Sequence, residues 1–281
     1  MKTLGYYDGQ IGELEDMKVS MLDRACYFGD GIYDATYSRN KKIFALDEHI
    51  DRFYRGLEKV DIKLDMTKEQ LKDLLLSLVK KVDEDELFVY WQATRGEGLR
   101  EHCYENMTAK LWVMLKPQSI VDMSQKIRLV THEYIRYTLC DIKTLNLLPN
   151  VLFSQYAKSK NAHECILHRG DRVTECAHSN IHILKDNVLI TPPTDCFILK
   201  GVAREHLINA CKALGICVDI RPFSLDEMMN SDEVILTSSG SLCLQVESID
   251  GKEVGGKSNN TIKLLQEYLL GEFRSNTEYE G

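Results

Sequence analysis

The sequence lacks long apolar runs and is poor in proline, and each shortage removes a class of protein. No stretch approaches the roughly 18 consecutive apolar residues of a membrane helix, and the segment from Met1 to Gly9 has no apolar core of a signal peptide. We therefore expect a cytoplasmic protein with no membrane partner. Only 5 of the 281 residues are proline, which fits an ordinary soluble globular chain.

The cysteines show no paired spacing. There are 9 of them, an odd number, and no C-x-x-C motif occurs, whereas a disulfide scaffold or a zinc site would show paired cysteines. The 8 histidines form no H-E-x-x-H or similar ligand pattern. We expect buried free thiols in a reducing compartment, and no metal site.

Basic charge is also in short supply. The formal net charge is −8, and surfaces that bind nucleic acid or anionic membranes need a concentrated basic face. We therefore expect no nucleic-acid partner. A hydrophobic content of 44% over 281 residues allows a large core, in one big domain or in two modest ones.

The first third of the chain predicts a small sheet and two helices. Asp8-Gly9 predicts a hairpin turn. Gly29 and Gly31, in a strand-like run rich in aromatic residues, allow a close backbone approach that would bring Tyr33 into a site. One helix begins after Asp47 as N-cap, and Thr67 opens a second with a capping box. The first helix shows an apolar stripe formed by Ile50, Phe53, Tyr54, Leu57 and Val60.

Arg52 and the loop that carries Arg100 and His102 could each bind an anion or be ordinary solvated surface. Arg52 lies off the apolar stripe of its helix, as a solvated charge would. Arg100 and His102 lie in a glycine-punctuated loop between predicted strands at 86–95 and 109–115. In an extended segment, side chains two residues apart point the same way, so this pair could bind a carboxylate. The alternative is a mobile charged loop.

The composition loosens after Pro117, which predicts a domain boundary. We expect a smaller N-terminal domain over 1–117, a linker over 118–125 and a larger C-terminal domain over 126–281. In the second domain, tight turns at Gly170-Asp171 and Asp186-Asn187 each join two short apolar segments. Repeated tight turns predict a largely antiparallel, meander-like core.

Lys143 stands in an apolar stretch near the middle of the sequence, before a helix that Pro149 is expected to open. Burying an ammonium is costly, so a lysine in such company tends towards the neutral form, which is a nucleophile. Our hypothesis is that Lys143 holds an aldehyde cofactor as a Schiff base and moves protons on the substrate. A solvated surface lysine is the alternative.

Two segments of the second half predict anion binding. Gly201 precedes an amphipathic helix, whose first amides would point outward. Ser238 and Ser239 lie in a Ser/Gly turn after the apolar strand 234–236. Two phosphate-sized sites and a sequestered lysine indicate a phosphorylated aldehyde. Glu175 lies between two predicted strands, and a solvent-facing role is its plain interpretation.

Several blocks of the sequence together carry a resemblance. They are Phe28-Gly29-Asp30-Gly31-Ile32-Tyr33, His49-Ile50-Asp51-Arg52, the loop with Arg100 and His102, Lys143 with 145–148, Thr174-Glu175, Ser179-Asn180 and Leu199-Lys200-Gly201. Together they resemble the fold-type IV, pyridoxal-phosphate-dependent aminotransferases, most closely the group that acts on D-amino acids, and the resemblance covers nearly the whole chain. It implies an α/β (α+β) fold of two domains, in which the larger C-terminal domain contains a mostly antiparallel, barrel-like sheet.

The resemblance also implies a role for each matching residue. Lys143 would bind pyridoxal 5'-phosphate covalently and act as acid and base, and Glu175 would face the ring nitrogen. The phosphate would be bound by Arg52, Val202, Ala203, Ser238 and Ser239, and Leu199 would contact the cofactor. Tyr33, Arg100 and His102 would hold the substrate's α-carboxylate. The cofactor would alternate with pyridoxamine phosphate as a D-amino acid and a 2-oxo acid exchange the amino group.

Two residues depart from the family pattern. His178 stands where the family has small residues, so it could fill a pocket beside Lys143 or turn outward, and we favour a role in the site. Ala203 stands where relatives often have a hydroxyl. Aminodeoxychorismate lyase and branched-chain L-amino-acid aminotransferase activities are the alternatives, although the lyase would not need Arg100 and His102. The family further implies a homodimer.

Overall fold

The chain divides into two units in a computed structural model that describes residues 2–134 and 137–278. The first unit comprises Met1–Ile120, Ile142–Asn146 and Phe273–Gly281, and the second comprises Val121–Asp141 and Leu147–Glu272. The main division falls inside the predicted linker. However, the stretch around Lys143 and the end of the chain group with the first unit, whereas the sequence placed both in the second domain. Whether each unit folds independently stays a prediction.

The first unit contains an antiparallel sheet in the order β2-β1-β6-β5-β3-β4. Its strands are β1 (Leu4–Tyr7), β2 (Gln10–Gly12), β3 (Gly31–Arg39), β4 (Lys42–Ile43), β5 (Glu86–Thr94) and β6 (Lys110–Pro117). The hairpin predicted at Asp8-Gly9 is confirmed, because both residues adopt positive φ values of 47° and 93° between β1 and β2. Such a turn matches the twist of the two strands.

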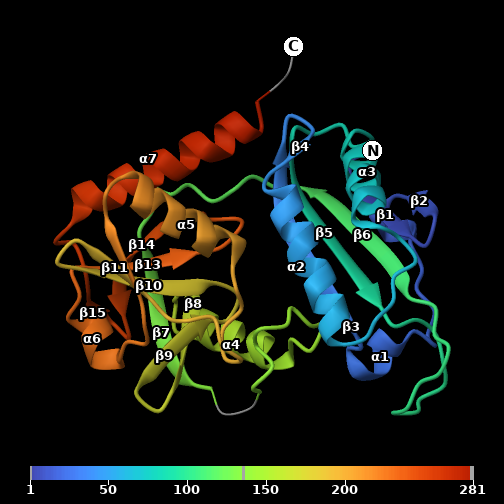
Figure 1. Cartoon of the computed structure of the whole chain (residues 1–281), viewed down its shortest axis with the longest axis horizontal. Coiled ribbons are helices and arrows are strands. Elements are labelled where there is room, and N and C mark those ends of the chain that lie inside the picture. The colour runs from blue at the N-terminus through green and yellow to red at the C-terminus, as the bar shows by residue number, and fades with distance from the viewer. Residues whose placement is uncertain (1, 135–136, 279–281) are drawn as a thin grey trace. The chain divides into compact units, whose positions relative to one another are not determined.

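Two long helices cover this sheet, and α2 lies along β3 (Figure 1). The unit's helices are the short 3-10 helix η1 (Leu14–Asp16), α1 (Arg24–Phe28), α2 (Leu46–Lys59) and α3 (Lys68–Val79). The predicted stripe of α2 is confirmed at Ile50, Phe53 and Leu57, which are buried against the sheet. The capping box at Thr67 is confirmed as well.

The predicted N-cap of α2 is wrong by two residues. Ala45, not Asp47, precedes the helix, and its carbonyl accepts from the amide of His49. Ala45 has a left-handed conformation with φ 50°, which alanine rarely adopts and which no local propensity would predict. Asp47 lies in the first turn instead, where a negative charge favours the positive end of the helix dipole.

The second unit contains a curled sheet in the order β12-β11-β10-β13-β14-β7-β8-β9, with β15 paired to β14. Its strands are β7 (Ile127–Glu133), β8 (Glu164–Arg169), β9 (Arg172–Cys176), β10 (Asn180–Lys185), β11 (Val188–Thr191), β12 (Cys217–Ile220), β13 (Glu233–Thr237), β14 (Leu244–Ile249) and β15 (Lys252–Glu253). The hairpins β8-β9 and β10-β11 confirm the predicted tight turns.

The mostly antiparallel, barrel-like sheet predicted for this unit is confirmed, although three strand pairs, β7-β8, β11-β12 and β14-β7, are parallel. Parallel neighbours in sequence need a crossover. Helix α4 (Leu148–Ser159) supplies it between β7 and β8, and α5 (Val202–Ala213) supplies it between β11 and β12. The unit also has α6 (Leu225–Met229) and α7 (Asn259–Asn276), whose last residues group with the first unit.

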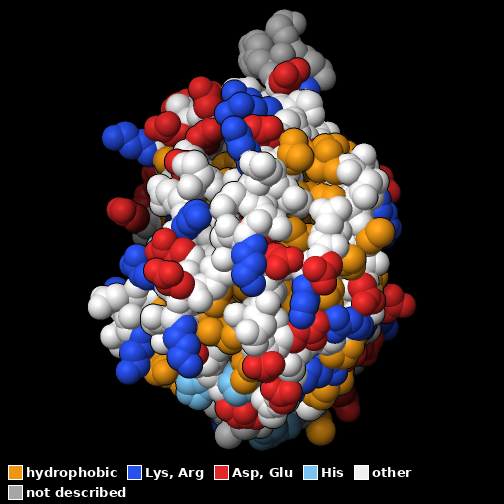
Figure 2. Space-filling view, turned by 90° about the vertical axis from the view of Figure 1, so that its left-hand side faces the viewer, with side chains coloured by type: hydrophobic (Ala, Val, Ile, Leu, Met, Phe, Trp, Pro, Cys, Tyr) orange, Lys and Arg blue, Asp and Glu red, His pale blue; other side chains and the backbone are white. Residues whose placement is uncertain are grey.

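The distribution of surface charge and the burial of the cysteines bear on two expectations drawn from the composition. On the face shown in Figure 2, Lys and Arg side chains are interspersed with Asp and Glu, so neither sign forms a continuous field there. All 9 cysteines are free, but only Cys165, Cys176, Cys211 and Cys243 are buried, so the expectation of buried thiols was too general. Within 2–134 and 137–278, no helix is long and apolar enough to cross a membrane.

Candidate active site

Arg52 is buried in a charged cluster within the first unit rather than solvated. Its Nε and Nη2 donate to the two carboxylate oxygens of Asp34 at 2.8 and 2.7 Å. Nδ1 of His49 lies 2.7 Å from Oδ1 of the same carboxylate. The exposed fractions are 9% for Arg52 and 0% for Asp34 and His49. The cluster therefore fixes the guanidinium in one orientation against β3.

The cluster combines an ionised carboxylate with a neutral imidazole. Burial alone would raise the pKa of Asp34, but the charges and hydrogen bonds of Arg52 and His49 outweigh it and hold that pKa well below its ordinary value. Burial lowers the pKa of His49, although Asp34 opposes this shift. Asp34 was not singled out in the sequence, where it looks like one polar residue in a strand. Only its contact with α2 reveals its role.

The segment around Lys143 is fixed by backbone hydrogen bonds to the start of β3. The amide of Tyr33 donates to the carbonyl of Lys143, and the amide of Leu145 donates to the carbonyl of Gly31, both at 3.0 Å. A Cβ on Gly31 would lie 2.6 Å from Cδ1 of Leu145 and 2.7 Å from the carbonyl oxygen of Ala93. The close backbone approach predicted for this glycine is confirmed, and it places Tyr33 beside Lys143.

The side chain of Lys143 lies against an aromatic ring. Its Nζ is 4.4 Å from the centroid of the Tyr33 ring, which stacks in turn on Tyr90 with the centroids 5.5 Å apart. The apolar neighbours of Lys143 in the sequence suggested a fully buried side chain, but Lys143 is half-buried. The ring face favours a cation at this place, and the partial exposure leaves the amine accessible for chemistry.

Arg100 and His102 converge on the same aromatic side chain. The Arg100 guanidinium carbon is 5.4 Å from the centroid of Phe28, and the His102 ring is 5.2 Å from it. Both residues are exposed. The segment is bent, because the amide of Glu101 donates to the carbonyl of Leu99 at 2.8 Å. The two side chains thus contact the same ring although the segment is not extended, and their binding of a carboxylate stays a prediction.

A buried arginine anchors this loop, and sequence reasoning missed it. Arg24, which is 3% exposed, donates from Nη1 to the carbonyl of Glu101 at 2.6 Å and from Nε to Asp30 at 2.8 Å. Arg95 also donates to Asp30, and its guanidinium carbon lies 3.8 Å from the centroid of the Tyr104 ring. The sequence signal for this anchor was Asp30, which stands between two glycines and whose carboxylate accepts hydrogen bonds from both arginines.

Glu175 is held at the edge of the sheet in the second unit. Its Oε2 accepts from the amide of Leu199 at 2.9 Å, and the carbonyl of Leu199 accepts from Nδ2 of Asn180 at 3.0 Å. Glu175 and Leu199 are half-buried, whereas Asn180 is 6% exposed. These bonds hold the predicted acid in place beside the start of α5.

The start of α5, where the sequence predicts anion binding, has no side-chain cap. Gly201 is its N-cap and provides no side-chain cap, so the first amides of the helix, at Val202 and Ala203, retain their donor capacity. A Cβ on Gly201 would collide with Oδ1 of Asn180, so a larger residue there would displace the side chain that donates to the carbonyl of Leu199. The predicted turn after β13 is present too, and its amides at 241 and 242 donate to the carbonyl of Ser238 at 3.2 and 2.8 Å.

His178 turns outward within its unit. Its side chain is 61% exposed, and Nδ1 lies 3.3 Å from Oε2 of the buried Glu164. The backbone amide of His178 donates to the other oxygen of Glu164 at 2.7 Å. Of the two interpretations that the sequence left open, this geometry favours the outward one, against our preference for a role in the site.

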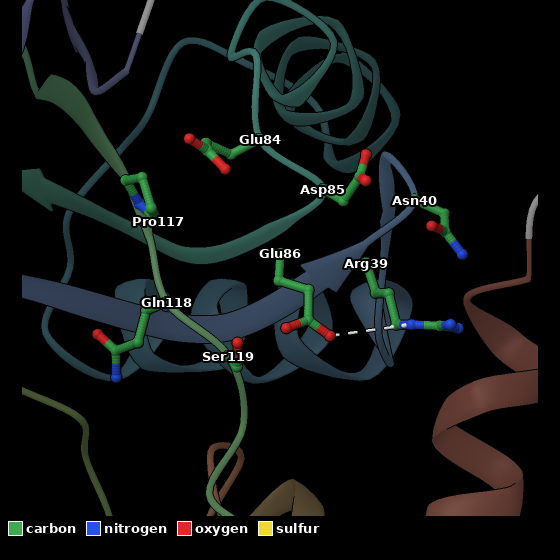
Figure 3. A pocket seen from close by; sticks show the side chains of 8 residues that line it. All are labelled: Arg39, Asn40, Glu84, Asp85, Glu86, Pro117, Gln118 and Ser119. Carbon is green, nitrogen blue, oxygen red and sulfur yellow. Dashed lines mark ion pairs between the residues drawn. The ribbon is translucent and has the colours of Figure 1, made fainter.

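One cavity of about 610 Å³ lies in the first unit and contains none of the predicted site residues. It is lined by Arg39, Asn40, Glu84, Asp85, Glu86, Pro117, Gln118 and Ser119 (Figure 3). Arg39 and Glu86 form a long ion pair of 3.8 Å there. Among the described residues, no group of three or more His, Cys, Asp or Glu side chains is placed to hold a metal ion.

The chain resembles known transaminases over nearly its whole length. It is 38% identical over 279 residues to a curated D-alanine aminotransferase of Listeria monocytogenes, covering 97% of this chain and 96% of that protein. Its identity to the D-alanine aminotransferase of Staphylococcus epidermidis is 36% over 264 residues, or 92% and 94% of the two chains.

Solved structures show the same fold at lower identity. The branched-chain amino acid aminotransferase from Escherichia coli superposes with a TM-score of 0.89 at 21% identity, covering 100% of this chain and 97% of that one. A fold IV-transaminase from Curtobacterium pusillum gives 0.83 at 20%, covering 95% and 99%. The family model described as amino-transferase class IV matches residues 31–249. This chain belongs to the class IV aminotransferase family.

Proposed function

We propose that this chain is a pyridoxal-phosphate-dependent transaminase that moves an amino group between a D-amino acid and a 2-oxo acid. The observation that carries the proposal is its likeness, over nearly the full length, to proteins named D-alanine aminotransferase. The convergence of Arg100 and His102 on Phe28 supports it, because an arginine beside a second nitrogen donor suits an α-carboxylate. The likeness to branched-chain enzymes is one of fold alone.

The residues of the second unit fit the cofactor. Gly201 leaves the α5 amides of Val202 and Ala203 without a side-chain cap, and a phosphate is the group that such a helix start binds best. Ser238 and Ser239 would add donors from the turn after β13. Glu175 provides a fixed carboxylate for a protonated ring nitrogen, and Leu199 would contact the ring.

In the first unit, we assign the chemistry to Lys143. When bound, pyridoxal phosphate withdraws electrons from the substrate's Cα. Lys143 would carry the cofactor covalently at rest, and its neutral amine would then take the proton from the substrate's Cα and deliver it to the aldehyde carbon of the cofactor. Tyr33 supports the amine with its ring face, and Arg52 would contribute a positive charge to phosphate binding. Ala203 would act through its amide because it has no hydroxyl.

The remaining partners follow from the family. An aminotransferase uses an amino acid and a 2-oxo acid in turn, so pyridoxamine phosphate forms in each cycle. We propose a homodimer in the cytoplasm. His178 is a candidate for substrate contact only if its exposed ring meets a neighbouring molecule.

The test is a half-reaction assay with purified holoenzyme. We expect D-alanine to convert the cofactor to its aminated form, and 2-oxoglutarate to restore it, as followed by cofactor absorbance. L-leucine, under the same conditions, should react far more slowly. Turnover of L-leucine without D-alanine would refute the assignment.

An Arg100→Ala variant tests the carboxylate contact in the same assay. We expect the D-alanine half-reaction to lose at least about 2 kcal/mol in transition-state stabilisation, which is typical of a lost charged hydrogen bond. Arg55→Ala supplies the control, because Arg55 is an exposed arginine of α2 outside the loop. Equal rates in the Arg100 variant and the wild type would place the carboxylate contact elsewhere.

A further inference from the structure

His182 is a fully buried histidine in the second unit whose two ring nitrogens both contact threonine hydroxyls. Nδ1 lies 2.9 Å from Oγ1 of Thr191, and Nε2 lies 2.9 Å from Oγ1 of Thr237. The three residues are on adjacent strands: His182 on β10, Thr191 at the end of β11 and Thr237 at the end of β13. The β10-β11 register, which pairs Ile183 with Ile190, places His182 directly opposite Thr191.

Arg204 extends this network into α5. Its Nε donates to Oγ1 of Thr191 at 3.2 Å, and its Nη2 donates to the carbonyl of Pro192 at 3.0 Å. With the ring protonated on Nε2, every bond runs in one direction, from Arg204 through Thr191 and His182 to Thr237. Hydrogen bonds that are aligned in this way strengthen one another. The exposed fraction is 3% or less for each of these four side chains, Arg204, Thr191, His182 and Thr237.

The ring of His182 is neutral at physiological pH. Burial, assisted by the charge of Arg204, lowers the pKa of His182 to about 3. A neutral imidazole has one donor and one acceptor, and the two threonines use both. An apolar side chain in its place would leave two buried hydroxyls without this partner, so the ring serves to fix both strand ends.

The two ends of the network adjoin the two segments expected to bind an anion. Thr237 immediately precedes Ser238 and Ser239, and Arg204 immediately follows Val202 and Ala203. We propose that His182 is a positioning residue that holds the start of α5 and the turn after β13 at a fixed separation, so that both bind one phosphate group. This inference rests on the proposed function, which supplies the phosphate.

The test compares two probes that differ only in the phosphate. Pyridoxal 5'-phosphate and pyridoxal are titrated into the full-length protein stripped of cofactor, and the ratio of their dissociation constants measures the contribution of the phosphate. In His182→Leu we expect this ratio to fall roughly tenfold, which corresponds to about one displaced hydrogen-bonded contact. His182→Gln, whose amide supplies both a donor and an acceptor, should recover part of it.

Ile183→Ala is the matched control. Ile183 is also fully buried on β10 but points to the opposite face of the sheet, so its truncation leaves a cavity without touching the network. We expect its melting temperature to fall while its probe ratio stays within about twofold of the wild type. If His182→Leu does not fold, Thr237→Val removes one bond of the network and takes its place.

The possible results distinguish a failure of the role proposed for His182 from a failure of the proposed function. A wild-type protein that binds both probes equally would refute the phosphate site and with it the proposed function. A wild type that prefers the phosphate, together with an unchanged ratio in His182→Leu or Thr237→Val, would overturn only the role of His182. A ratio that falls equally in Ile183→Ala would also overturn it, because general destabilisation would then explain the effect.

Discussion

Each unit buries a histidine completely, but the two are paired by opposite means. In the first unit, His49 contacts the carboxylate of Asp34, which also binds Arg52. In the second, His182 contacts the hydroxyls of Thr191 and Thr237. One cluster balances a side-chain cation against an anion. The other links the neutral ring of His182 to two hydroxyls, and the cation at its end, Arg204, pairs with Glu205 on its own helix.

The difference indicates two ways to hold the groups that we propose bind the phosphate. Arg52 brings a full charge, which must be compensated when no anion is bound, and Asp34 provides this compensation. The helix start at Gly201 brings only partial charges, and Arg204, the cation of its network, already pairs with the half-exposed Glu205 on the same helix. Breaking the first cluster should therefore destabilise the protein more than breaking the second.

Asp34→Asn should give the largest effect. The substitution leaves Arg52 buried without its ionised partner, and removing one member of a buried ion pair typically destabilises a protein by about 3–5 kcal/mol. We expect a loss of this size in the free energy of unfolding, measured by urea denaturation of the cofactor-free protein.

Asp51→Asn provides the control, because Asp51 lies next to Arg52 on α2 and forms an exposed ion pair with Lys68. Exposed pairs contribute little, so its unfolding curve should nearly coincide with that of the wild type. A similar loss of unfolding free energy in both variants would show that burial of the Asp34 cluster does not matter, and it would contradict the expected difference between the two clusters.

Acid should act on His182 and on Asp34 over different pH ranges. His182 is neutral when folded, with a pKa of about 3, and is protonated when unfolded below about pH 6.5. The unfolded state therefore binds the extra proton, and stability falls as the pH falls from about 6.5 towards 3, by about 1.4 kcal/mol per pH unit. Asp34, with its lowered pKa, loses its contribution only below about pH 4.

The expected result is a flatter dependence of unfolding free energy on pH between about 6 and 4 in His182→Gln than in the wild type, by about one proton. His163→Gln is the matched control, because His163 is exposed. Identical slopes in the wild type and His182→Gln would mean that His182 is already charged in the folded state.

Local pattern predicted much of the fold. The stripe of Ile50, Phe53 and Leu57 and the turn at Asp8-Gly9 depend on nearby residues, and the structure confirms them. The parallel pairing of β7 with β8 depends on how α4 packs, which no short window contains. Ala45 caps α2 in a conformation that alanine rarely adopts, so propensity pointed to Asp47 instead.

The resemblance predicted the residues of the candidate site one by one, but it did not predict the residues that hold them in place. Lys143 and Glu175 stand in recognisable blocks. Asp34 and Arg24 act through partners far along the chain: Arg24 donates to the carbonyl of Glu101, 77 positions away. Such pairs become visible only when the sheet brings distant strands and helices together. The roles proposed for the site residues stay predictions.

The most direct test of the account asks which amine carries the cofactor. Borohydride reduction of the holoenzyme fixes pyridoxal phosphate on its lysine, and peptide mass spectrometry then identifies that lysine. We predict that the label lies on the peptide containing Lys143, and that Lys143→Ala gives no labelled peptide while still folding. A label on any other lysine of the wild-type protein would contradict the central role assigned to Lys143.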